Sequence, residues 1–134
     1  MKRYHLDANV ILRFLRNDDP QQSPAAKRLI AAGQEGYVVL ILSAVTIAEV
    51  FYAFRTSYKM ARPEIAKLLG NLLCSSVFEI EHETRVLDAM ERVERSNVDF
   101  GDAYLAATAV EAGEAVASFD DDFRKFPDVK LHVP

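Results

Sequence analysis

Four acidic side chains stand at places in the sequence where chemistry could occur. Asp7 ends a first short strand-like segment, and Asp120 follows another at residues 115–119. Glu49 interrupts an otherwise apolar helical segment, and Asp102 lies in the first turn of an alanine-rich one. Two carboxylates about 4 Å apart repel each other by roughly 4 kcal/mol at an effective dielectric constant near 20. If these four acids meet, cations must lie between them.

Mg²⁺ and Mn²⁺ are the cations that suit such a site, because both prefer carboxylate and water oxygens as ligands. Ions held in this way can activate water and stabilise the charge that develops on a phosphodiester during in-line displacement. Four converging acids therefore predict metal-dependent phosphodiester hydrolysis. The sequence has no GxxxxGK[ST] loop and no GxGxxG pattern to cradle a nucleotide, which argues against a hydrolase of small phosphates.

Each acid also has a simpler structural explanation. Asp7 could cap the helix that follows it, and Asp120 could cap a turn. Asp99 and Asp102 have the spacing of a capping box, in which the second acid bonds back to the first residue. Glu49 is harder to explain, because no charge three or four residues away could pair with it. We expect it to point into a polar cleft, with a solvated surface position as the alternative.

The elements that must position these acids alternate between strands and helices. Periodicity and turn residues predict strands at 4–7, 37–42, 77–80, 115–119 and 129–133, helices at 8–16, 24–36, 44–54, 64–72, 83–97 and 100–112, and a helical turn at 121–126. This alternation predicts an α/β fold with a parallel sheet covered by helices. Ligands bind such folds beyond the carboxyl ends of the strands, where Asp7 and Asp120 stand.

Three local signals refine this prediction. Ser23 and Ser43 are expected to cap the helices that follow them, and Gly113 is expected to end the alanine-rich helix. Residues 37–54 are apolar over a length close to that of a membrane span. Glu49 would cost a few kcal/mol inside a membrane, and Ser43 divides the segment. We therefore expect a buried strand followed by a helix, and no membrane partner.

The composition predicts a single globular domain over residues 1–134. Half of the residues are apolar and 27% are charged, which is the range of folded domains. One cysteine excludes a disulfide framework and a cysteine-based zinc site, and it fits a cytoplasmic protein. The net charge of −4 gives no overall attraction to nucleic acid, so binding must be local. The candidate contacts are Arg13, Arg16, Lys27, Arg55, Lys59 and Arg62.

Four short motifs, taken in order, resemble those of the PIN-domain ribonucleases. They are Asp7-Ala8-Asn9, Glu49 in the helix after the second strand, Val98-Asp99-Phe100-Gly101-Asp102-Ala103, and Ser118-Phe119-Asp120-Asp121-Asp122-Phe123. The set is most similar to the VapC-like toxins of bacterial and archaeal toxin–antitoxin pairs. It covers the chain from Tyr4 to Val133. Ala8 departs from the Thr often found there, which removes one hydroxyl and leaves every acid in place.

This resemblance implies a PIN-like three-layer α/β sandwich, with a parallel sheet of about five strands and helices on both faces. It implies Mg²⁺- or Mn²⁺-dependent endonucleolytic cleavage of RNA. Carried over by position, the catalytic and metal-binding acids would be Asp7, Glu49, Asp102 and Asp120. Asp99 and Asp122 would be secondary acidic positions. Asn9 and Ser118 would be supporting polar residues that orient the carboxylates.

The resemblance also implies partners. A VapC-like toxin would cut an RNA substrate, pair as a homodimer and be silenced by a cognate antitoxin whose segment fills the groove over the acids. Two other functions stay open at this point. The chain could be a catalytically inactive PIN-like interaction module that keeps its acids only as caps. It could also be a metal-dependent phosphatase acting on small molecules.

Overall fold

Six helices and parallel strands build the chain, and the predicted α/β class is confirmed. The computed structural model describes residues 1–134. The elements are β1 (Lys2–His5), α1 (Ala8–Arg16), α2 (Gln22–Gln34), β2 (Val38–Leu42), α3 (Ala44–Thr56), α4 (Arg62–Leu73), β3 (Phe78–Ile80), α5 (Glu83–Ser96), α6 (Phe100–Ala112), β4 (Val116–Ala117), the 3₁₀ helix η1 (Asp121–Lys125) and β5 (Leu131–His132). Every predicted strand and helix is present, with ends that differ by a few residues.

The five strands form two parallel sheets, where the sequence predicted one. One sheet has the order β1–β2–β3, and the other consists of β4 and β5. β4 and β5 contain two residues each, so they offer few hydrogen bonds to a further strand. β1 is an edge strand, because it comes first in the order of its sheet, and all four of its residues are exposed. Its outer edge keeps backbone groups that another strand could pair with.

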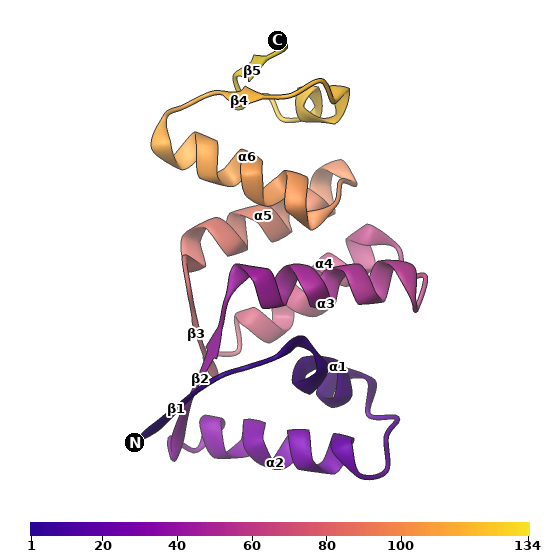
Figure 1. The fold of residues 1–134 in the computed structure, drawn as a ribbon, viewed down its shortest axis with the longest axis vertical. Helices are drawn as coiled ribbons and strands as arrows, with labels where there is room; N and C mark the ends of the chain where they lie inside the picture. Colours follow the sequence, from indigo (N-terminus) through magenta and orange to yellow (C-terminus); the bar gives the residue numbers. More distant parts are fainter.

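The molecule is elongated, and its elements follow one another along the long axis (Figure 1). The three-stranded sheet lies toward the end that holds α1 and α2, whereas α5, α6 and the two-stranded sheet lie toward the other end. The helices α3 and α4 lie between these groups, and the two termini are at opposite ends. The start of α1 and the start of η1 are therefore well separated.

A continuous apolar core fixes the helices that carry the acids. One apolar stripe of α3 is buried, with Ile47, Phe51 and Phe54 each no more than 3% exposed. The ring of Phe51 packs against that of Phe100, with centroids 6.3 Å apart. Because Phe100 is the first residue of α6, this contact fixes the start of α6 against the middle of α3. Asp102 lies in that same first turn.

Two of the three predicted local signals are confirmed. The hydroxyl of Ser43 accepts a hydrogen bond from the backbone N–H of Thr46 at 3.2 Å, so Ser43 caps α3 and divides the apolar segment into β2 and α3. Gly113 ends α6 with a φ of +70°, in the left-handed region that favours glycine. None of the helices is both long enough and apolar enough to span a membrane.

Ser23 does not cap α2, contrary to the prediction. The helix begins at Gln22, two residues before the predicted start. The carboxylate of Asp19 accepts hydrogen bonds from the backbone N–H groups of Gln21 and Gln22 at 2.9 and 2.7 Å. Ser23 is buried, and its hydroxyl donates to the carbonyl of Arg13 at 2.8 Å. Asp19 reaches the free N–H groups at the helix start, so the hydroxyl of Ser23 is available to tie α2 to the end of α1.

Candidate functional site

Three aspartates gather where α6 begins and η1 begins. One carboxylate oxygen from each of Asp102, Asp120 and Asp122 lies within 4.8 Å of the others. Asp102 comes from the first turn of α6, whereas Asp120 and Asp122 come from the segment after β4. Asp102 and Asp122 are half-buried, and Asp120 is exposed. We refer to these three residues as the Asp102 cluster.

Local hydrogen bonds set the position of Asp120. Its backbone N–H donates to the hydroxyl of Ser118 at 2.9 Å, and its Oδ1 accepts the backbone N–H of Asp122 at 2.9 Å. Asp120 therefore caps η1, as the structural explanation predicted, and also belongs to the Asp102 cluster. The two roles are compatible, because the capping bond uses Oδ1 and leaves the second carboxylate oxygen free of it. Ser118 thus bonds the backbone of Asp120 and makes no hydrogen bond to its carboxylate; its proposed role in orienting the acids stays a prediction.

The surroundings of Asp102 disfavour its negative charge. Burial is the largest cause that raises the pKa of this carboxyl above its ordinary value. The charges of Asp120, Asp99 and Asp122 raise the pKa further, and only the guanidinium of Arg62 opposes them. A divalent cation among the carboxylates would relieve this repulsion. A donor set made of carboxylate oxygens alone fits Mg²⁺ or Mn²⁺.

Asp99 lies next to the cluster and forms an ion pair. Its Oδ1 accepts a hydrogen bond from the Nε of Arg62 at 2.8 Å. Asp99 precedes the first residue of α6, yet its side chain makes no capping hydrogen bond. The capping box that the spacing of Asp99 and Asp102 allowed is therefore not formed. The carboxylate of Asp99 is held by Arg62, which comes from the start of α4.

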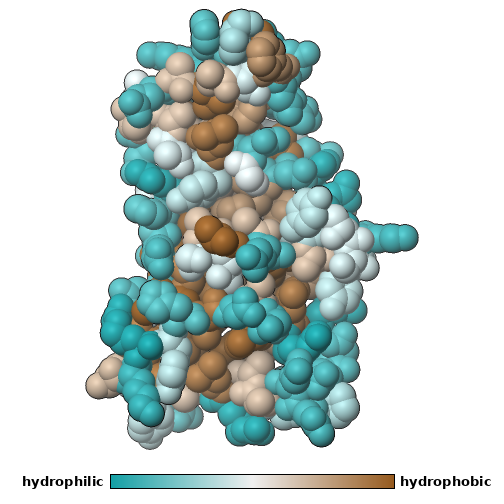
Figure 2. Space-filling model, viewed as in Figure 1, coloured by the Kyte–Doolittle hydropathy of each residue, from teal (hydrophilic) through white to brown (hydrophobic).

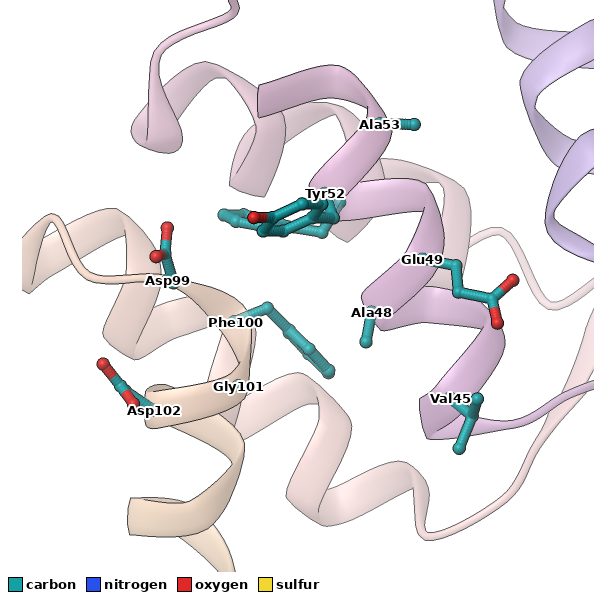
Figure 3. A pocket seen from close by; sticks show the side chains of 10 residues that line it. Val45, Ala48, Glu49, Tyr52, Ala53, Asp99, Phe100, Gly101 and Asp102 are labelled. Atoms are coloured by element: carbon teal, nitrogen blue, oxygen red, sulfur yellow. The ribbon is translucent and has the colours of Figure 1, made fainter. Parts of the chain in front are cut away.

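A groove of about 710 Å³ between α3 and α6 links Glu49 to the Asp102 cluster. Its apolar lining comes mainly from α3, with Phe100 contributed by α6. Figure 3 shows Phe100 and Ala48 in the middle of the groove. Glu49 and Asp102 stand on opposite sides of it, and their carboxylates point away from each other. The exposed Glu49 thus lines the groove, but it is not part of the Asp102 cluster.

Asp7 also lies outside the Asp102 cluster. It is exposed between β1 and α1, and its side chain makes no capping hydrogen bond. The preceding residue, Leu6, accepts a hydrogen bond through its carbonyl from the hydroxyl of Thr46 at 3.0 Å. Asp7 therefore follows a residue that is bound to the first turn of α3, the helix that carries Glu49. Asn9 is exposed on α1 and lines a separate, smaller groove between α1 and α2.

Two residues at the site, Asp122 and Lys125, were not among the principal site residues predicted from the sequence. Asp122 was a secondary position, yet it belongs to the cluster. Lys125 lies beside the cluster as well, with its Nζ 3.3 Å from Oδ1 of Asp122. The spacing of three residues between them was the available signal, since such pairs face each other on a helical turn. No local signal connects Arg62 with Asp99, which are 37 residues apart.

Comparison with known proteins identifies the family of the chain. The PIN domain family matches residues 4–129. A search of curated proteins found no match. PIN domains are generally nucleases, which implies a nucleic-acid substrate, and they typically bind divalent metal ions. Because the match spans nearly the whole sequence, this chain belongs to the PIN domain family.

Proposed function

We propose that this protein is a Mg²⁺- or Mn²⁺-dependent endoribonuclease. The observation that carries the proposal is the Asp102 cluster, in which three carboxylates lie within 4.8 Å of one another in a chain of a nuclease family. Asp102, Asp120 and Asp122 would hold the metal ion. When bound at such a site, a divalent ion activates water and neutralises charge on the phosphodiester that is cut.

The residues around the cluster support this function by positioning its acids. The contact between Phe51 and Phe100 fixes the turn that carries Asp102. The hydroxyl of Ser118 and the capping bond of Asp120 hold the second segment in place. A hydrogen bond to one oxygen of a ligating carboxylate, such as the one from the backbone N–H of Asp122 to Asp120, orients that carboxylate toward a bound ion. The groove between α3 and α6 offers room for a substrate directly beside Asp102.

Asp7 and Glu49 remain part of the proposed site. β1 has a free edge, and β4 ends just before Ser118 and Asp120. In the structure, β1 and β4 lie in separate sheets toward opposite ends of the molecule. If β4 instead pairs in parallel with the free edge of β1 in the active protein, Asp7 and Asp120 would come to the same side of one sheet, because parallel strands end at a shared edge. The single sheet of about five strands expected from the sequence would then form. Glu49 would meet the other acids from α3, on the far side of the groove.

The nuclease activity can be tested with the purified protein and a fluorescently labelled single-stranded RNA. We expect endonucleolytic products in Mn²⁺ or Mg²⁺ and none in EDTA. Hydrolysis of p-nitrophenyl phosphate without RNA cleavage would favour the small-molecule phosphatase instead. Binding of RNA or protein with no hydrolysis in either metal would favour the interaction module.

The more specific role that we propose is that of a VapC-like toxin, which acts on cytoplasmic RNA, forms a homodimer and binds an antitoxin over the acids. Exposed apolar side chains on α3 and α6 support a protein contact there, since Val45, Tyr52 and Leu105 are 69%, 64% and 47% exposed. Figure 2 shows apolar residues in small patches between polar ones on one face.

The toxin role can be tested by expression in a bacterial host. Expression of the wild-type protein should arrest growth, and expression of the Asp102→Asn variant should not. Equal growth of the two cultures would contradict the toxin role.

A further inference from the structure

An acidic site in an acidic chain must still attract a phosphodiester. The chain has a net charge of −4, and the Asp102 cluster repels a phosphate at the place where cleavage is proposed. Cations next to the cluster would have to offset this repulsion locally. Of the ion pairs in the structure, only two involve the cluster or its neighbour Asp99. They are Arg62 with Asp99 and Lys125 with Asp122.

Arg62 is held in place by one hydrogen bond, and its other N–H groups remain free to donate. Its Nε donates to Asp99 at 2.8 Å, and its two terminal nitrogens donate no hydrogen bond within the chain. The side chain is 27% exposed, so it is partly ordered by packing and still reaches solvent. A guanidinium is planar and matches the two oxygens of a phosphate with two parallel N–H groups. The charges of Asp99, Asp122 and Asp102 all act on it, which places it within the field of the cluster.

Lys125 supplies a second cation, paired with an acid of the Asp102 cluster. Its Nζ lies 3.3 Å from Oδ1 of Asp122, and the side chain is 45% exposed. An ammonium group has three donors, so the ion pair with Asp122 leaves donors for another anion. Arg62 and Lys125 thus pair with two different acids of the site, and each keeps free donors.

The other basic side chains proposed from the sequence are engaged elsewhere or carry no link to these acids. Arg13 donates to Gln22 at 2.7 Å, and Arg55 donates to the carbonyl of Met60 at 3.3 Å. The guanidinium of Arg16 stacks on the ring of Tyr58 at 4.2 Å. Arg62 is the one member of that set bonded to an acid of the site.

We propose that Arg62 and Lys125 together bind backbone phosphates of the RNA strand that crosses the Asp102 cluster. Arg62 would keep its Nε on Asp99 and offer its terminal nitrogens to one phosphate, and Lys125 would contact another. The contacts are to the backbone and carry no base specificity. This inference rests on the nuclease function proposed above, and it names the residues that hold the substrate.

The test is the salt dependence of RNA binding, measured without cleavage. Fluorescein-labelled oligouridine is titrated with the protein in EDTA at increasing KCl, and binding is followed by fluorescence anisotropy. For a single strand, each phosphate contact contributes about 0.7 to the slope of log K against log salt. We expect Arg62→Gln and Lys125→Gln each to reduce the slope by about 0.7, and the double variant to reduce it by about twice that amount.

Two control variants separate this role from a structural one. Arg62→Lys keeps the charge and should keep the slope. Arg95→Gln removes the same charge from an exposed pair on α5, 76% exposed, and should leave the slope unchanged. Unchanged slopes in both Arg62→Gln and Lys125→Gln would overturn the proposal. An equal reduction of the slope in Arg95→Gln would overturn it too, as would a wild-type protein that does not bind the RNA. The side chain of Lys125 is more exposed than that of Arg62, at 45% against 27%, so the Lys125→Gln variant still decides if Arg62→Gln fails to fold.

The nuclease function and the phosphate contacts fail in distinguishable ways. If RNA is cut in Mn²⁺ but neither substitution changes the slope, the nuclease proposal stands and the phosphate contacts are wrong. If the slopes change as expected but no cleavage occurs in Mn²⁺ or Mg²⁺, Arg62 and Lys125 bind RNA in a protein that is not a nuclease.

Discussion

Replacing Asp102 with Asn is expected to lower Mn²⁺-dependent RNA cleavage by more than about 100-fold. A residue that only orients a metal ligand already costs 10- to 100-fold when it is lost, so a ligand should cost more. Asn keeps the size of the side chain and removes the charge that would attract the ion. The substitution also removes a carboxylate that burial and three neighbouring acids disfavour. The variant should therefore fold at least as well as the wild type in EDTA.

Initial cleavage rates of a labelled RNA measure this effect, and circular dichroism reports on folding. Asp18→Asn is the matched control, because Asp18 is exposed in the turn before α2 and belongs to no part of the site. Its cleavage rate should equal that of the wild type. Undiminished cleavage by a folded Asp102→Asn variant would show that the chemistry takes place elsewhere.

Asp7→Asn extends the same assay to the acid that lies outside the cluster. If β4 pairs with β1 in the active protein, this variant should lose cleavage about as severely as Asp102→Asn. Its carboxylate makes no capping bond, so a loss of helix stability would not explain the defect. Full cleavage by Asp7→Asn would limit the site to the Asp102 cluster and remove Asp7 from the proposal.

Arg92→Gln is expected to lower the free energy of unfolding by about 2 kcal/mol. The side chain of Arg92 is 11% exposed. It donates to both oxygens of Asp128, at 2.8 and 2.6 Å, and to Asp88 at 3.0 Å. Removing one partner of a buried ion pair costs about 3–5 kcal/mol, and exposed pairs contribute about 0–1 kcal/mol. Asp128 and Asp88 are partly exposed, so we expect a value between these limits.

Arg92 connects α5 with Asp128, in the segment that follows η1. Its loss should therefore loosen the attachment of the segment that carries Asp120 and Asp122. The guanidinium of Arg92 also lies 5.2 Å from the centroid of Phe126. Urea unfolding measures the change, with Arg95→Gln on the same helix as the control. Arg95 is 76% exposed and pairs with Glu91 one turn away, so its loss should cost less than about 0.5 kcal/mol. Equal effects of the two substitutions would contradict the anchoring role of Arg92.

The contribution of Arg92 should also depend on pH. Hydrogen bonds from its guanidinium lower the pKa of the Asp128 carboxyl in the folded state. Asp128 therefore adds stability above its unfolded-state pKa, and this stability is lost as the pH falls through the lower folded-state pKa. The difference between wild type and Arg92→Gln should be largest near neutral pH and shrink in that acidic range. A difference that grows on acidification would contradict this linkage.

Local features of the sequence predicted most of the elements, because each has a cause within a few residues. The apolar stripe of α3, the cap at Ser43 and the end of α6 at Gly113 depend on spacing and side-chain chemistry alone. Ser23 failed as a cap for a related reason, since Asp19 was a competing acceptor four residues earlier. Where two acceptors compete for the same N–H groups, the pattern does not decide between them.

The assembly of the site depends on contacts that no local pattern encodes. Whereas the structure brings Asp120 together with Asp102, the sequence placed Asp120 at one edge of a sheet with Asp7, because both follow strands. It had no means to predict that Arg62 would hold Asp99 across 37 residues, or that β4 would leave the edge of β1 unpaired. The convergence of Asp7 and Glu49 with the cluster depends on that edge and stays a prediction.

Thermal unfolding of wild type and Asp102→Asn, each in EDTA and in Mn²⁺, tests most directly whether the gathered carboxylates bind a divalent ion. An ion that binds only the folded protein adds about 2.7 kcal/mol of stability at 100 times its dissociation constant. For a chain of this length, that stability corresponds to a rise in melting temperature of roughly 10 °C. We expect the wild type to show this rise and Asp102→Asn to lose most of it. A wild type that melts at the same temperature in Mn²⁺ as in EDTA would contradict the account.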